Sequence, residues 1–560
     1  SWLHDDLKPF IHIDANETFK ILREKIHTDY YEKLIEEYFL KNHHKAVLVM
    51  KPKLNLLEQQ EKNLKEKLKR ILANMTQEEI GAIKADAELL EKFQKTEDTP
   101  ENLAKIPVLH REDLKREAYK LYNEPGKIGD TEFVFHDVFT NGIGYLELSF
   151  ELDKIPAEYY PYVGILSNVL FNLSTKNYEY GEIINEIDLY TGGIWSSTAV
   201  CRLRKKPGDC RTFVTINTKY KYEQLGKALE LIREVATTSR FEDDKRLLEV
   251  LEEYVSYTRQ GMISSGNSVA ANRALSYQNL ADAYNDVLSK LSLYRLYCDI
   301  LDDYEGKKAF LIERLGTLAK MIFRVENMRI DFTGAREEIP NLSAQIEEFK
   351  KCLFDCEVEK GSFVPELTKK NEGFMAPSQV QYVCRAGNYV KKGLPYDGSL
   401  KVLKVMMGYE YLWMNVRVQG GAYGCSCNFA PTGESVFVSY RDPNLEKTVE
   451  VYEGAADFIR NFQADERTMT KYVIGAIGEL DTPMTPATKG AISKEAYLIG
   501  VTEEDLQRER DEILATTPEK IRSLAKYVDA FMEDDLFSVV GNTNKIKENE
   551  KMFGTVENLL

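Results

Sequence analysis

Hydrophobic residues recur at helical spacing between residues 399 and 418. The apolar positions are Leu400, Val402, Leu403, Val405, Met406, Leu412, Trp413 and Val416. The pattern predicts a helix that ends at Gly420-Gly421, because glycine adopts a left-handed or tightly turned backbone at little cost. Residues 435–440 then read as a strand. Tyr423 is therefore expected just past a helix end, at the mouth of a strand.

The same order of elements is predicted twice. The first copy has a strand pair around 133–150, helices at 157–173 and up to Tyr190, Gly192-Gly193, a strand at 211–217 and a helix at 222–237. The second has strands near 379–385, a helix at 399–418, Gly420-Gly421, a strand at 435–440 and a helix at 444–458. The glycine pairs are offset by 421 − 193 = 228 residues. We predict an α+β fold with two similar domains, each a mostly antiparallel sheet packed by helices, preceded by a helical hinge. The alternative is two unrelated α+β domains with chance glycine pairs.

The first 105 residues have a different character. Residues 18–40 are expected to form a helix and 45–51 a strand ending before Pro52. A single helix and strand cannot form a sheet core, so we expect them to be the tail of a preceding domain within a larger parent protein. Residues 54–105 are strongly charged and helical in pattern, which is typical of a helical arm or linker.

Composition narrows the class of protein. The chain has 560 residues, 43% of them hydrophobic, which suggests about three or four domains. A net charge of −16 argues against nucleic-acid binding and is compatible with cationic peptide partners. No apolar run approaches the length of a membrane span, and no signal peptide is evident, so we expect a cytoplasmic or organellar matrix protein without a membrane partner. The eight dispersed cysteines are expected to be reduced thiols with packing roles.

The candidate chemistry lies at the end of the 399–418 helix. Arg417 and Tyr423 stand six residues apart around Gly420-Gly421. A guanidinium and a phenol are both hydrogen-bond donors, and two converging donors can stabilise a developing oxyanion. The alternative interpretation is a half-buried strand tyrosine beside a solvated helix arginine.

The chain resembles the insulinase or pitrilysin family of zinc metallopeptidases, most closely its presequence-protease branch. The resemblance rests on the Arg417 to Tyr423 motif, the duplicated order of elements, the Phe139–Leu148 segment and the charged arm. It implies four α+β domains in two halves that close around an unfolded peptide, with this chain as the C-terminal half. The implied parts are the end of the second domain (1–53), the hinge (54–105), the third domain (106–340), a connecting segment (341–374) and the fourth domain (375–560).

The inverted zinc motif of that family, His-x-x-Glu-His, is absent from this chain. All seven histidines lie in the first 136 residues, and none is followed by Glu-His at the required spacing. The aligned helix of the first repeat places Ile165, Asn168 and Val169 at the motif positions, within a residue or two. The resemblance therefore implies no metal ligands and no cofactor in this chain, zinc in the missing N-terminal half, and an inactive chain when isolated.

The resemblance carries over Arg417 and Tyr423 as catalytic residues, with Gly420 and Gly421 as substrate-binding residues. In the family, this pair reaches across the closed chamber toward the zinc-bound substrate, where it can stabilise charge on the scissile carbonyl. The implied partners are unfolded peptides and the N-terminal catalytic half. The alternative is a non-catalytic scaffold or partner subunit of the same superfamily. An unrelated hydrolase has little support, because no Gly-x-Ser-x-Gly elbow, phosphate loop or calcium loop is present.

Overall fold

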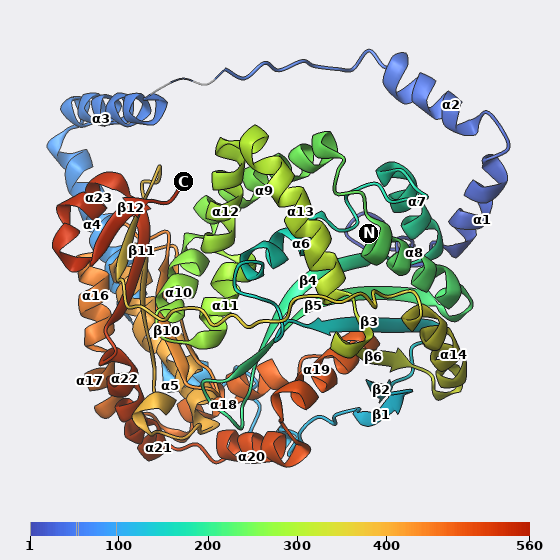
Figure 1. Cartoon of the computed structure of the whole chain (residues 1–560). Helices are drawn as coiled ribbons and strands as arrows, with labels where there is room; N and C mark the ends of the chain where they lie inside the picture. Colours follow the sequence, from blue (N-terminus) through green and yellow to red (C-terminus); the bar gives the residue numbers. More distant parts are fainter. Residues whose placement is uncertain (1, 52, 54, 97) are drawn as a thin grey trace. The chain divides into compact units, whose positions relative to one another are not determined.

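A computed structural model describes residues 2–51, 53, 55–96 and 98–560, and the chain divides into two units, residues 1–107 and 108–560 (Figure 1). Each unit is described by itself.

The first unit is helical. Its elements are α1 (Asn16–Lys25), α2 (Tyr30–Ile35), the π-helix η1 (Glu36–Leu40), α3 (Leu56–Asn74), α4 (Gln77–Lys95) and α5 (Pro100–Leu103). The predicted helix over 18–40 is thus interrupted between α1 and α2. In the predicted arm, a capping box at Thr76 starts α4, because the Thr76 hydroxyl accepts from the Glu79 N–H and the Glu79 carboxylate accepts from the Thr76 N–H.

The predicted strand at 45–51 is wrong. Residues 45–51 form no strand, and Val47, Leu48, Val49 and Met50 are all exposed. A strand needs a neighbour to satisfy its backbone groups, and the described residues place none beside this segment. Pro52, Leu54 and Glu97, which the predicted strand end and arm include, lie outside the described residues.

The second unit contains two sheets. The strands of the first sheet are β1 (Glu124–Ile128), β2 (Thr131–Asp137), β3 (Ile143–Glu151), β4 (Ile194–Arg202), β5 (Cys210–Lys221) and β6 (Met328–Gly334). Those of the second are β7 (Glu372–Ala376), β8 (Tyr382–Asn388), β9 (Gly424–Phe429), β10 (Glu434–Tyr440), β11 (Leu536–Asn542) and β12 (Thr555–Asn558). The strand orders are β1-β2-β6-β3-β5-β4 and β12-β7-β11-β8-β10-β9. We call residues 124–350 the first repeat and residues 372–558 the second repeat.

The two sheets have the same topology over five strands. β2 pairs with β6 in parallel, as β7 does with β11. The pairs β3·β6, β3·β5 and β4·β5 are antiparallel, as are β8·β11, β8·β10 and β9·β10. The glycine pairs occupy the same place, just before the edge strands β4 and β9, and Gly193 and Gly421 both have positive φ. The predicted α+β duplication is therefore confirmed. The remaining strands differ, since β1 is antiparallel to its neighbour and β12 parallel.

Helices pack against both sheets. The first repeat contains α6 (Val163–Val169), α7 (Tyr180–Tyr190), α8 (Leu225–Thr238), α9 (Asp244–Ser264), α10 (Gly266–Ser276), α11 (Leu280–Ser289), α12 (Leu291–Asp302), α13 (Tyr304–Ile322) and α14 (Ile339–Lys350). The second contains α15 (Ser399–Met406), the π-helix η8 (Met407–Gln419), α16 (Glu446–Glu453), α17 (Ala455–Arg460), α18 (Glu466–Leu480), α19 (Pro486–Ile499), α20 (Glu503–Leu514), α21 (Pro518–Ser523), α22 (Ala525–Met532) and α23 (Thr543–Glu548).

Several expected elements need correction. The strands β2 and β3 exist, but they are not a pair, because β6 lies between them. The helix expected over 157–173 is α-helical only at Val163–Val169. The 399–418 helix ends at the glycines as predicted, but it is a π-helix from Met407 onward. The 444–458 helix divides into α16 and α17 at Gly454.

Each repeat contributes one helix to the sheet of the other repeat (Figure 1). α10 lies on the second sheet, where Ala270 and Ala274 share an apolar cluster with residues of β7, β8 and β11. α19 lies on the first sheet, where the Lys494 ammonium is 2.6 Å from the Glu147 carboxylate. The two repeats therefore share their packing.

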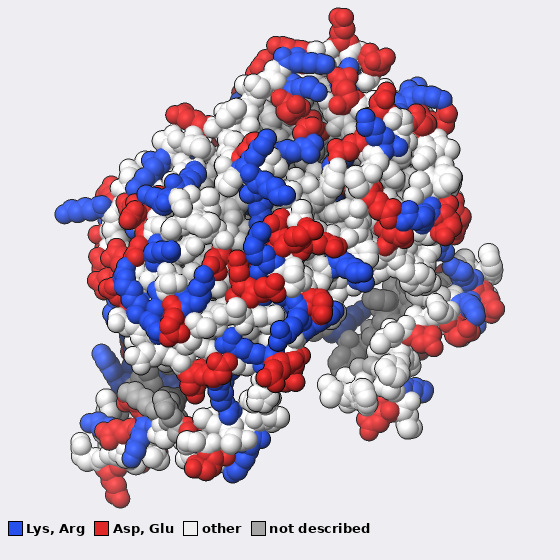
Figure 2. Space-filling model, turned by 90° about the horizontal axis from the view of Figure 1, so that it is seen from below, with Lys and Arg blue, Asp and Glu red and all other residues white. Residues whose placement is uncertain are grey.

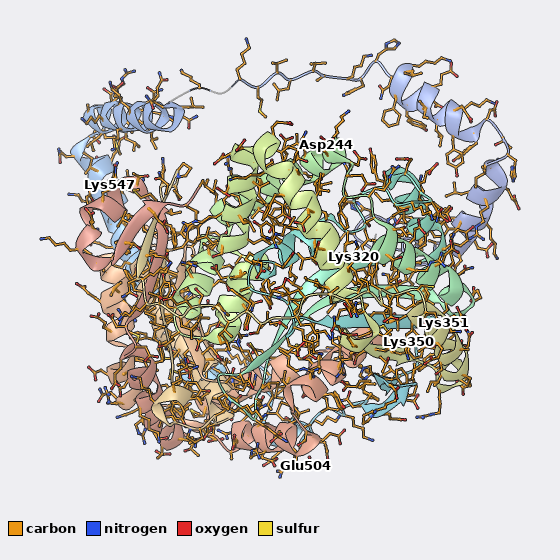
Figure 3. All side chains as sticks on the ribbon, viewed as in Figure 1. Asp244, Lys320, Lys350, Lys351, Glu504 and Lys547 are labelled. Carbon is orange, nitrogen blue, oxygen red and sulfur yellow. The ribbon has the colours of Figure 1, made fainter. Side chains whose placement is uncertain are left out.

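The last helix of the first repeat is fixed to its sheet edge. The Lys350 ammonium at the end of α14 donates to the Ile128 carbonyl of β1 at 3.1 Å, and it pairs with Glu347 (Figure 3). Leu342, Ile346 and Phe349 of α14 belong to the core of the first repeat. Charged side chains of both signs alternate over the face seen in Figure 2.

A buried charge cluster joins the two repeats. The Arg202 guanidinium, at the end of β4, hydrogen-bonds to Asp282 of α11, and its Nε is 3.9 Å from Glu434 of β10. Asp282 is 5% exposed, and its Oδ2 has no partner among the described residues. Burial raises the pKa of Asp282 to about 6, although Arg202 opposes the shift. Glu434 raises this pKa further and Lys391 lowers it.

We expect Asp282→Asn to flatten part of the pH dependence of stability. Because the folded pKa lies above the ordinary value of 3.8, the native state binds this proton more tightly than the unfolded chain, so stability falls as the pH rises from about 4 to 6. The variant should lose about 3 kcal/mol of the difference in unfolding free energy between pH 4 and pH 7. Denaturant unfolding at both pH values measures it. Asp188→Asn, at an exposed position on α7, is the control. An unchanged pH profile in Asp282→Asn would contradict the assignment.

Candidate substrate-carbonyl site

The end of η8 is built by backbone hydrogen bonds that require the two glycines. The Gly421 N–H donates to the Arg417 carbonyl at 2.8 Å, and the Ala422 N–H donates to the Val416 carbonyl at 3.1 Å. Gly421 has φ +81°, which L side chains rarely adopt. A Cβ at Gly420 would lie 2.4 Å from the Val416 carbonyl oxygen. The glycines therefore set the sharp turn from helix to strand, and Asn444 holds it by donating from Nδ2 to the Gly420 carbonyl at 2.6 Å.

Tyr423 stands immediately before β9 with its side chain toward solvent. Its N–H donates to the Tyr440 carbonyl at 3.1 Å, which fixes the backbone to β10. The ring packs edge-on against Tyr440 with centroids 5.8 Å apart. The side chain is nevertheless 65% exposed. The phenol is thus held by its ring and left accessible at its hydroxyl.

Arg417 lies between two aromatic rings. Its guanidinium carbon is 3.9 Å from the Trp413 ring centroid and 5.5 Å from that of Tyr423. Within the part of the chain that the structure describes, its guanidinium has no ion pair or hydrogen bond. Stacking on Trp413 orients the donors of Arg417 without consuming them. The structure therefore brings together Arg417 and Tyr423 at the glycine turn, with both sets of donors available.

Sequence reasoning missed the supporting residues of this site. The apolar pattern counts Trp413 as a core residue of the helix, but it is 39% exposed and lies beneath the arginine. Its spacing of four from Arg417 was the available signal. No sequence signal pointed to Tyr440 or Asn444, which come from β10 and the loop after it.

The first repeat carries no equivalent donor pair. The offset of 228 residues places Trp195 opposite Tyr423 and Leu189 opposite Arg417. Both are exposed, at 49% and 74%. An indole and an aliphatic side chain stand where the second repeat has a phenol and a guanidinium.

The residues at the zinc-motif positions do not fit a metal. Ile165 and Val169 of α6 are fully buried in the apolar core, and the Asn168 amide donates to the Tyr297 hydroxyl at 3.2 Å. Among the described residues, no group of three His, Cys, Asp or Glu side chains is placed to hold a metal ion. None of the described helices has the length and apolar character needed to cross a membrane.

Solved structures share this fold. A structure described as a peptidase M16 inactive domain from Pseudomonas fluorescens aligns with a TM-score of 0.51 at 14% identity, covering 76% of this chain and 98% of that one. A protease structure from Helicobacter pylori aligns with a TM-score of 0.53 at 12% identity, covering 75% and 99%. The fold is thus that of M16 peptidase domains.

Sequence comparison refines the class. Residues 50–300 match the model of the region associated with peptidase family M16, subfamily C, and residues 371–545 match the PreP C-terminal domain model. The chain belongs to subfamily C of the M16 peptidases, as a region of the kind found at the C-terminal end of presequence proteases.

Full-length relatives extend beyond this chain. Protein HypA of Clostridium perfringens is 34% identical over 560 residues, covering 100% of this chain and 57% of that protein. Presequence protease 1, chloroplastic/mitochondrial, of Arabidopsis thaliana is 30% identical, covering 97% and 51%. The chain therefore spans about half the length of these curated relatives.

Proposed function

We propose that this chain is the substrate-binding half of a zinc metalloendopeptidase that degrades unfolded peptides, with the zinc site in a separate catalytic half. The observation that carries the proposal is the convergence of Arg417 and Tyr423 at the glycine turn, with the donors of both accessible. The family relationship supports it, since several relatives are named presequence proteases.

The chemistry follows from the donor types. Hydrolysis of a peptide bond places negative charge on the carbonyl oxygen, and donors fixed in advance stabilise that charge in the transition state. Tyr423 offers one O–H, and Arg417 offers a planar fork of N–H groups. Gly420 and Gly421 shape the turn that holds both residues, and their lack of side chains leaves room for a peptide beside them.

The first unit is proposed to bind the catalytic half. Many of its large apolar side chains are exposed, including Leu3, Leu7, Phe10, Phe19, Ile21, Ile26, Tyr38, Phe39, Val47 and Leu48. Exposed apolar surface on this scale is typical of an interaction site. In this proposal, residues 1–53 complete a domain of the catalytic half, 54–105 form the hinge, 106–340 and 375–560 form the third and fourth domains, and 341–374 connect these two.

The alternative function is a non-catalytic scaffold or partner subunit. The description of the Pseudomonas fluorescens structure as an inactive domain favours it at the level of fold. A scaffold has no chemical need for an accessible guanidinium and phenol at one turn, so the Arg417–Tyr423 pair favours the enzymatic half.

We expect the isolated chain to hold no stoichiometric zinc and to hydrolyse no peptide, because its described residues supply no set of three ligands. Metal analysis after purification without chelators, together with a peptide cleavage assay, measures both. Adding a zinc-bearing catalytic half should restore cleavage. Zinc bound by side chains of this chain, or cleavage by the chain alone, would contradict the proposal. Failure of the mixture to cleave would favour the scaffold.

A further inference from the structure

A cavity of about 180 Å³ lies between the first sheet and α19. His136 of β2, Glu147 of β3 and Asp331 of β6 line it from the sheet, with Trp195 of β4 also in its wall. Trp195 is 49% exposed, so it places the cavity at the surface. The opposite wall is α19, which approaches the sheet closely at Gly490. The cavity is therefore built by both repeats.

His136 presents an unused acceptor to this cavity. Its Nδ1 is 2.9 Å from the Tyr122 carbonyl oxygen. A carbonyl only accepts, so Nδ1 carries the proton, and the neutral ring has a lone pair at Nε2. His136 is 1% exposed, and its Nε2 has no hydrogen-bond partner among the described residues. A buried acceptor without a donor is costly, so a ligand that supplies an N–H would be stabilised here.

The charges in the cavity select the sign of that ligand. Asp331 Oδ1 lies 3.7 Å from His136 Nε2. Asp331 is held by two bonds of 3.0 Å from Arg329, which lies outside the cavity lining. Glu147 adds a second carboxylate, whose Oε2 contacts the Lys494 ammonium from α19 at 2.6 Å. An anion would face two carboxylates and a lone pair, whereas a cation gains from all three.

Two further features fit a cationic side chain rather than a free ion. The Trp195 indole can stack on a guanidinium or ammonium group. Leu146, Ala487 and Ala491 provide apolar lining for an aliphatic stem. Lys494 already places one ammonium against Glu147 in this cavity, so the walls accommodate this chemistry.

We propose that the cavity binds the guanidinium or ammonium group of an arginine or lysine side chain on a bound peptide. This rests on the proposed function only in that the bound molecule is a peptide. His136 Nε2 and Asp331 receive the donors, Trp195 covers the group, and Lys494 competes for Glu147.

The test uses the whole chain with Trp2→Phe and Trp413→Phe, which leaves Trp195 as the one tryptophan. Three short Gly-Ser peptides are titrated, each with a single arginine, citrulline or glutamate. Citrulline keeps the shape and N–H donors of arginine without its charge. We expect the arginine peptide to change Trp195 fluorescence and to bind at least about threefold more tightly than the citrulline peptide. The glutamate peptide should bind most weakly.

Two variants, measured by calorimetry in the otherwise unaltered chain, sharpen the test. Trp195→Leu should weaken arginine-peptide binding by about 2- to 30-fold. Lys494→Met removes the competitor for Glu147 and should tighten binding by about two- to fivefold, a gain that a purely structural lysine would not give. Tyr257→Leu, an exposed tyrosine on α9, is the control and should bind as the parent chain does.

Equal affinity for the arginine and citrulline peptides would overturn the proposal, as would weaker binding in Lys494→Met. A fluorescence change with zinc or magnesium alone, and none with the arginine peptide, would assign the cavity to a metal ion instead and would also overturn it. These are binding measurements on the chain alone. The role of Tyr423 is tested by turnover, so the two proposals can fail separately.

Discussion

Replacing Tyr423 by Phe is expected to lower turnover about 10²- to 10³-fold in the complete protein, with the proposed catalytic half present. Loss of one oxyanion donor typically costs roughly 3 to 4 kcal/mol in the transition state. The substitution removes only the hydroxyl, and the edge-on contact with Tyr440 stays available to the ring. Turnover and Michaelis constant on an unstructured peptide measure the effect, and a thermal melt should show an unchanged fold.

Tyr409→Phe is the matched control. Tyr409 lies on the same π-helix and is 67% exposed, but it makes no ring contact with Arg417 in the described structure. Its Phe variant should turn over normally. Arg417→Lys should also reduce turnover, because a point-like ammonium cannot reproduce the fork of donors that stacks on Trp413. Normal turnover in Tyr423→Phe would remove the catalytic role assigned to this residue.

Replacing Arg273 by Met is expected to destabilise the chain by about 3 to 5 kcal/mol. Arg273 of α10 donates to both carboxylate oxygens of Glu372, at 2.9 and 2.8 Å, and to Asp286 at 2.7 Å. The Tyr277 hydroxyl also donates to Glu372, at 2.8 Å. The charged groups are all nearly inaccessible, with side-chain exposures of 8%, 2% and 6% for Arg273, Glu372 and Asp286. Removing the cation leaves two buried carboxylates without compensation.

Denaturant unfolding at pH 7 measures this loss. Arg336→Met is the control, because Arg336 also pairs with two carboxylates, those of Glu124 and Asp137, but is 52% exposed. Water replaces the partner of an exposed ion, so this variant should change stability little. Equal losses in the two variants would show that burial does not decide the strength of these clusters.

The repeated order of elements was predictable because it depends on local patterns. Periodic apolar residues and the glycine pairs mark the same helix-to-strand turn at Gly193 and Gly421, whatever surrounds it. The insertion of β6 between β2 and β3 was not predictable in this way. β6 begins at Met328, far along the chain, and its pairing depends on long-range register.

The candidate site shows the same division. Arg417 and Tyr423 are close in sequence, so their spacing around the turn indicated that they meet, although their catalytic role stays a prediction. The π-helix was missed because an apolar stripe does not distinguish i→i+4 from i→i+5 hydrogen bonds. Tyr440 supports the phenol from the neighbouring strand, and strand pairing is not encoded in local spacing.

The exchange of α10 and α19 between the repeats also has a consequence in time. During synthesis, α10 leaves the ribosome at residue 276, whereas β11, part of the sheet it covers, begins at residue 536. The apolar side of α10 must therefore wait for some 536 − 276 = 260 further residues before that sheet can be completed. Contacts over such distances form slowly and leave apolar surface open to aggregation in the interval. The nascent first repeat is thus the stage at which this chain has most need of a chaperone.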